Sequence, residues 1–70
     1  MILEILRVER MRTRRDRWAL AAAVEAVPGV RRVLANQADR TLRVEREDDS
    51  SLAAIIQAIN DAGYDVAVLA

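Results

Sequence analysis

The stretch VERMRTRRDRWAL (Val8–Leu20) decides the fold, because a short apolar strand gives way to a helix within it. The preceding segment from Ile2 to Val8 is aliphatic and too short for a stable helix, so it predicts a strand. Five arginines lie within the eight residues Arg10–Arg17, here called the arginine loop. The position resembles a ligand-binding loop. The chain has no Cys and no His, so the loop cannot hold a soft metal ion through thiolate or imidazole.

A helix is predicted from Asp16 to Val27, beginning at the end of the arginine loop. Thr13 or Asp16 is expected to cap its start, and Asp16 is also well placed against the positive end of the helix. Pro28-Gly29 is expected to end it, since Pro cannot continue a helix and Gly permits a reversed backbone. Apolar residues recur along this segment at spacings of three and four, at Leu20, Ala23, Val24 and Val27.

The second half of the chain predicts a hairpin, a helix and a last strand. Strands are expected around Val30–Ala35 and over Thr41–Arg46, with turn residues from Asn36 to Arg40 between them. Asp65–Ala70 is expected to form the last strand after Gly63 ends the helix. That helix follows the polar segment Glu47–Ser51, and its apolar positions are Leu52, Ile55, Ile56, Ile59 and Ala62.

The order β-α-β-β-α-β predicts an α+β, ferredoxin-like sandwich in a single domain over residues 1–70. Two helices should cover one face of a four-stranded antiparallel sheet and leave the other face open. Alternation assigns to the core side Leu6, Val8, Val33, Val66 and Val68. It assigns to the open face Leu3, Ile5, Leu34, Ala67 and Leu69, which is more apolar than contact with solvent alone would favour.

Composition places the chain among soluble globular proteins. Its 70 residues are 53% hydrophobic and 31% charged, with a formal net charge of zero. No targeting signal is visible, and no apolar run approaches the about 20 residues of a membrane span, so we expect a cytoplasmic protein that does not bind membranes. Charge is unevenly spread, because basic residues gather in Arg7–Arg17 and acidic ones in Glu45–Asp49.

Several fragments, in this order, resemble the heavy-metal-associated (HMA) domain family, which includes small copper chaperones, mercury-binding proteins and the N-terminal modules of metal-pumping ATPases. The family pattern begins Val-x-Gly-Met-x-Cys-x-x-Cys-x-x-x-Val, and the resemblance covers nearly the whole chain. The fragments that match it are Val8, Met11, Leu20, Ala23-Val24, Pro28-Gly29-Val30, Val33, Val44 and Ala62-Gly63-Tyr64.

The departures from this pattern fall on its functional positions. Thr13 and Asp16 stand where the family has its two metal-binding cysteines, and Arg10 stands where it has the loop glycine. Hydroxyl and carboxylate are hard oxygen donors, unsuited to the soft ions that thiolates bind and too few for Mg²⁺ or Ca²⁺. The surrounding guanidinium groups also repel cations. We therefore expect a degenerate site with no metal and no cofactor.

Three other residues near this site have competing interpretations. Met11 resembles a thioether ligand, but at this position the family packs the residue under the loop, and a buried anchor is favoured. Tyr64 is expected beside the loop, at the rim of the core, with its hydroxyl bonded. Trp18 is expected to be an interface anchor or a ring stacked with Arg14 or Arg15.

The arginines admit three interpretations: a solvated basic face, a docking patch for an acidic protein surface, or a site for a small anion at the helix start. The expected partner- or anion-binding set is Arg10, Arg12, Arg14, Arg15, Arg17 and Trp18. Nucleic-acid binding is not expected, since zero net charge argues against it and the sheet offers no Phe or Trp for base stacking.

The preferred hypothesis is a non-catalytic, HMA-like interaction or regulatory module that docks through the arginine loop. An enzyme is not expected, because no nucleophile stands beside a possible base and there is no Cys, His or Lys. Two alternatives stay open. One is a metal-binding or metal-transport accessory protein with an unusual oxygen-ligand site, and the other is a structural module that forms homo-oligomers through the open sheet face.

Overall fold

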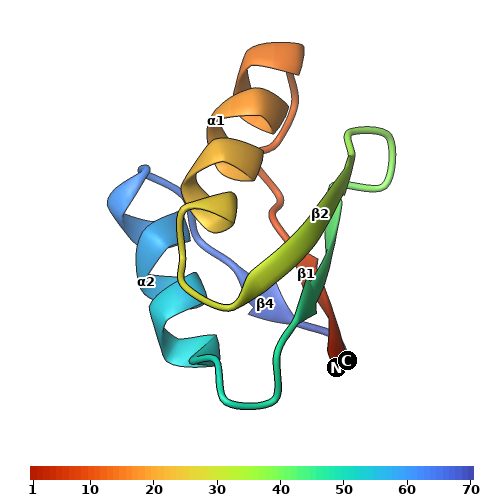
Figure 1. Ribbon diagram of the computed structural model, residues 1–70. Helices are drawn as coiled ribbons and strands as arrows, with labels where there is room; N and C mark the ends of the chain where they lie inside the picture. Colours follow the sequence, from red (N-terminus) through yellow and green to blue (C-terminus); the bar gives the residue numbers. More distant parts are fainter.

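The computed structural model describes all 70 residues and has two layers, a twisted sheet and a pair of helices that cover one of its faces (Figure 1). The strands lie in the order β2-β3-β1-β4, and all neighbours are antiparallel. This arrangement confirms the predicted ferredoxin-like fold. The elements are β1 (Ile2–Arg7), α1 (Arg14–Glu25), β2 (Val30–Asn36), β3 (Thr41–Arg46), α2 (Leu52–Asp61) and β4 (Ala67–Val68).

Local signals set the ends of the helices. Helix α2 begins after Ser51, whose hydroxyl accepts a hydrogen bond from the amide of Ala54 at 3.1 Å. Gly29, after α1, has a φ of +88°, and a Cβ there would lie 2.6 Å from the Cβ of Ser50. Glycine is therefore required at this turn both for its backbone conformation and for the close approach of the β3–α2 connection. Neither helix has the length and apolar character needed to cross a bilayer.

Strand β4 is shorter than the predicted Asp65–Ala70, since only Ala67 and Val68 pair in register with β1. The reason lies in the preceding connection. The amide of Tyr64 is still bonded to the carbonyl of Ile59 in α2 at 3.2 Å, so the next two residues must cross from the helix layer to the sheet. Beyond β4 the chain stays beside β1, because the amide of Leu69 donates to the carbonyl of Ile5 at 2.8 Å.

Ten apolar side chains form one core between the sheet and the helices. The expected core-side residues Leu6 and Val8 are fully buried, and Val33 and Val66 pack partly buried against the core. Val68 was wrongly expected in the core, since it pairs with Leu6 but is 44% exposed. It lies on an edge strand that packs against β1 and makes no comparable contact with either helix.

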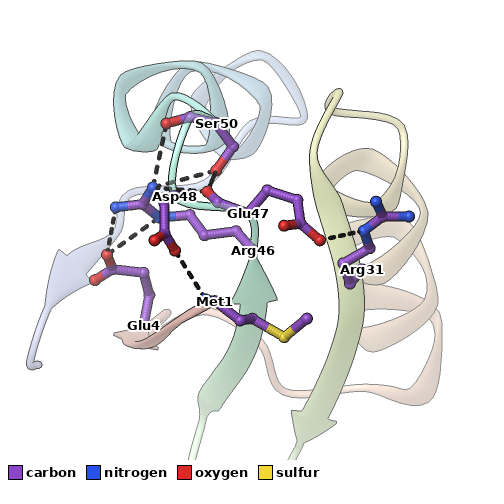
Figure 2. Close-up of polar contacts among 7 residues, drawn as sticks. All are labelled: Met1, Glu4, Arg31, Arg46, Glu47, Asp48 and Ser50. Atoms are coloured by element: carbon purple, nitrogen blue, oxygen red, sulfur yellow. Dashed lines mark hydrogen bonds and ion pairs between the residues drawn. The ribbon is translucent and has the colours of Figure 1, made fainter.

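A buried ion pair closes the core at the end that also carries the chain termini (Figures 1 and 2). Glu4 takes an inward position of β1, and its Oε1 accepts hydrogen bonds from Arg46 Nη2 at 2.8 Å and Nε at 3.2 Å. Arg46 Nη1 donates to the carbonyl and the hydroxyl of Ser50 at 3.1 and 3.2 Å. Glu4 and Arg46 are only 6% and 9% exposed. The pair thus ties β1 and β3 to the start of α2.

Replacing Glu4→Ala should destabilise the protein by about 3 kcal/mol, because it leaves the Arg46 guanidinium buried without its counter-charge. The free energy of unfolding from urea denaturation measures the effect. Glu25→Ala is the matched control, since Glu25 is exposed and has no ion-pair partner, and it should change stability by less than about 0.5 kcal/mol. Equal stability of the two variants would show that the ion pair does not hold this end of the core.

Candidate functional site

The arginine loop spans the end of the β1–α1 connection and the first turn of α1, at the end of the molecule away from the termini (Figure 1). The β2–β3 hairpin turn and the α2–β4 connection come to the same end (Figure 1). Three connections that are distant in the sequence therefore frame the site.

Thr13 and Asp16 act together in a capping box at the start of α1. The Thr13 hydroxyl accepts a hydrogen bond from the amide of Asp16 at 3.0 Å, and Asp16 Oδ2 accepts one from the amide of Thr13 at 3.0 Å. Asp16 Oδ2 also accepts a bond from the amide of Arg12 at 3.1 Å. Because Thr13 is the N-cap, α1 starts at Arg14, two residues before the predicted start.

The other carboxylate oxygen of Asp16 joins the loop to the distant α2–β4 connection. The hydroxyl of Tyr64 donates a hydrogen bond to Asp16 Oδ1 at 2.5 Å. Together with the amides of Arg12 and Thr13, this bond lowers the pKa of Asp16 from 3.8 to about 2. The same bond raises the pKa of Tyr64, which is half-buried. Asp16 is therefore a fixed internal anion that holds the loop closed.

Further bonds fix the base of the loop. Met11 is fully buried in the core, and its amide donates to the carbonyl of Val8 at 3.1 Å. Gln37, in the β2–β3 turn, donates its side-chain amide to the carbonyl of Arg12 at 2.8 Å. The amide of Val8 donates to the carbonyl of Arg40 in the same turn at 2.8 Å. In the sequence, Gln37 and Arg40 stand out only as turn residues.

The arginine side chains of the loop have no ion-pair partner within the molecule. Every ion pair in the protein involves other cations, including Arg7 and Arg40, which both bind Glu9. Arg14 lies over the ring of Trp18, with the guanidinium carbon 5.8 Å from the ring centroid, and Trp18 is 61% exposed. Half-exposed or exposed cations without a carboxylate within 4.0 Å are Arg10, Arg12, Arg14, Arg15 and Arg17.

The donors at the loop do not fit a soft metal ion. Thr13 and Asp16 offer oxygen only, and both Asp16 oxygens already accept hydrogen bonds. No group of three or more His, Cys, Asp or Glu side chains lies together anywhere in the protein. The loop presents unpaired positive charge around one carboxylate that is bonded internally.

Comparisons with known proteins give no match to a protein-family model and none to a curated protein sequence. Solved structures do match. CopZ metallochaperone is 30% identical over 94% of this chain and 100% of its own, with a TM-score of 0.89. Oxidized MerP from Ralstonia metallidurans CH34 is 26% identical over 99% and 97%, with a TM-score of 0.93. The N-terminal domain of PacS from Synechocystis PCC6803 is 26% identical over the full length of both chains, with a TM-score of 0.88.

The Asp16 bonds predict a specific dependence of stability on pH. The pKa of Asp16 is lowered on folding, so its contribution is fully present above its ordinary pKa of 3.8 and is lost as the pH falls through about 2. Asp16→Asn should be less stable than the natural sequence at about pH 5, and the gap should narrow towards about pH 2. Urea denaturation of both proteins across this range measures it. Other acids are common to both proteins and cancel, so a gap independent of pH would contradict the assignment.

Proposed function

This chain belongs to the heavy-metal-associated domain family, and we propose that it docks through its arginine loop on an acidic protein surface instead of carrying a metal ion. The observation that carries the proposal is the set of loop arginines, none of which has a carboxylate within 4.0 Å. Asp16 is the only acid among them, and its oxygens are engaged by Tyr64 and by backbone amides. The positive charge of the loop is thus available to a partner.

Charge of this kind favours fast and salt-sensitive association. Trp18 gives the same surface an apolar anchor, since its ring is largely exposed and stacks only with Arg14. Trp and Arg are among the residues enriched at the positions that contribute most to binding in protein interfaces. A small anion would use the arginines alone, whereas a protein surface would use the ring as well, and this favours the protein partner.

The proposed role is non-catalytic and cytoplasmic. CopZ is named a metallochaperone, but the residues at the corresponding loop of this chain supply no thiolate for such cargo. An oxygen-ligand metal site has no observation in its favour, because each oxygen of Asp16 already accepts a hydrogen bond. We infer that the family's docking surface is retained and its cargo site is lost.

Polyglutamate provides a test of docking on an acidic surface. Binding should change the fluorescence of Trp18, the only tryptophan, and should weaken roughly tenfold between about 50 and about 200 mM salt because of screening. Arg14→Gln/Arg15→Gln should reduce binding, since both side chains are exposed at the start of α1. Arg31→Gln/Arg32→Gln, with the same change in charge on β2, is the control and should bind like the natural sequence.

Sulfate separates the two kinds of partner. If sulfate at millimolar concentration alone reproduces the fluorescence change and displaces polyglutamate, the site takes small anions and the protein-docking proposal fails. Binding of polyglutamate that does not depend on salt, or that is unaffected by the Arg14 and Arg15 changes, would also contradict it.

Restoring two cysteines tests whether only the ligands have been lost. Thr13→Cys/Asp16→Cys should bind Cu(I) at one equivalent, because two thiolates at these positions supply the soft ligands that the loop lacks. Competition with a coloured Cu(I) chelator measures the binding. Asp16→Cys alone is the control and should compete far less well, and tight stoichiometric Cu(I) binding by the natural sequence would refute the proposal of a lost cargo site.

A further inference from the structure

The face of the sheet opposite the helices carries a mixed apolar and charged surface in which no charge has a partner. Both helices lie on the other side, so nothing in the chain covers this face (Figure 1). Leu3 is 44% exposed, Leu34 is 49% exposed and Leu69 is 54% exposed. A shallow hollow on this face is lined by Leu3, Arg32, Leu34, Arg43 and Glu45.

Strand register arranges these side chains in two neighbouring rows. In one row Glu45 of β3 lies between Arg32 of β2 and Leu3 of β1. In the next row Arg43 of β3 lies between Leu34 and Ile5. Because Arg43 and Glu45 are two residues apart on one strand, both point from the open face, side by side.

The charged groups of the two rows are unsatisfied within the molecule. Arg32, Arg43 and Glu45 take part in no ion pair. Glu45 is half-buried, yet its carboxylate accepts no hydrogen bond from any residue. A cation and an anion that stand adjacent but unpaired, within an apolar surround, form a self-complementary pattern.

We propose that this face binds the same face of a second copy of the chain. The two copies are related by a two-fold axis that lies between the sheets, runs perpendicular to the strands and passes midway between Arg43 and Glu45. Such an axis exchanges the two rows, so Arg43 of each copy meets Glu45 of the other and both ion pairs form at once. It also sets Leu3 of each copy against Ile5 of the other. Two sheets packed face to face lie about 10 Å apart, a gap that Arg and Glu side chains span together.

Charge selects this axis over its neighbours. An axis perpendicular to the strands and passing through Arg43 sets that cation against its own copy, and one through Glu45 does the same for two anions. The chosen axis also makes the two sheets antiparallel.

Sedimentation of the natural protein at concentrations up to about 1 mM should show a monomer–dimer equilibrium, since even weak interfaces are populated there. Arg43→Glu and Glu45→Arg should each weaken dimerisation by roughly tenfold or more, because each substitution sets two like-charged pairs face to face. Circular dichroism checks that the variants fold, as expected for changes at side chains outside the core.

Mixing the two single variants gives the decisive measurement. In a heterodimer of Arg43→Glu with Glu45→Arg, two ion pairs form again, one with its natural polarity and one with its signs exchanged, so the mixture should dimerise although neither variant does so alone. The double variant Arg43→Glu/Glu45→Arg should dimerise with itself for the same reason. A merely destabilising effect of either substitution predicts no such rescue.

Arg15→Glu is the matched control, since it makes the same charge change on the arginine loop and should leave the dimer intact. This control also separates dimerisation from the proposed docking role. Arg15→Glu should weaken polyglutamate binding and leave dimerisation unchanged, whereas Arg43→Glu should weaken dimerisation and leave polyglutamate binding unchanged. A natural protein that stays monomeric up to about 1 mM, or a mixture of single variants that fails to associate, would overturn the inference.

Discussion

The carboxylate of Asp16 is the constraint on which the loop end of the molecule depends. It accepts hydrogen bonds from two loop amides and from the hydroxyl of Tyr64, so two segments that are far apart in sequence meet at one charged group. This ionised carboxylate cross-links the loop to the α2–β4 connection.

The same carboxylate explains how five arginines gather in so short a segment. Like charges repel, and concentrated guanidinium groups raise the energy of the folded loop. A carboxylate with a pKa of about 2 stays ionised in the same segment at any physiological pH, and its charge offsets part of this repulsion. Asp16 is nonetheless bonded to Tyr64 and to the backbone, not to an arginine. The arginines are thus tolerated by the fold and still left free for an external partner.

Sequence periodicity was sufficient for the element order and for most of the core, because alternation and three-to-four spacing report which face of each element is apolar. It failed where a residue's environment is set by a distant segment. No sequence pattern links Glu4 to Arg46, 42 residues away, although their side chains form an ion pair in the core. Val68 lies on the core side of its strand, as alternation predicts, but neither helix packs closely enough against β4 to bury it. At the loop, the sequence offered Thr13 or Asp16 as the cap, but a capping box needs both, and its bond to Tyr64 depends on tertiary structure.

The two proposed surfaces lie on different parts of the fold and impose one further condition on a partner. The arginine loop lies at one end of the sheet, whereas the open face is the side of the sheet that the helices leave uncovered (Figure 1). In an antiparallel pair of copies, the two arginine loops point in opposite directions. A compact acidic protein can therefore engage only one loop of a pair. Avidity arises only for a partner that is long enough to reach both loops, or for one present in several copies within a larger assembly. Pairing of the sheets thus favours extended or multivalent acidic partners over small globular ones.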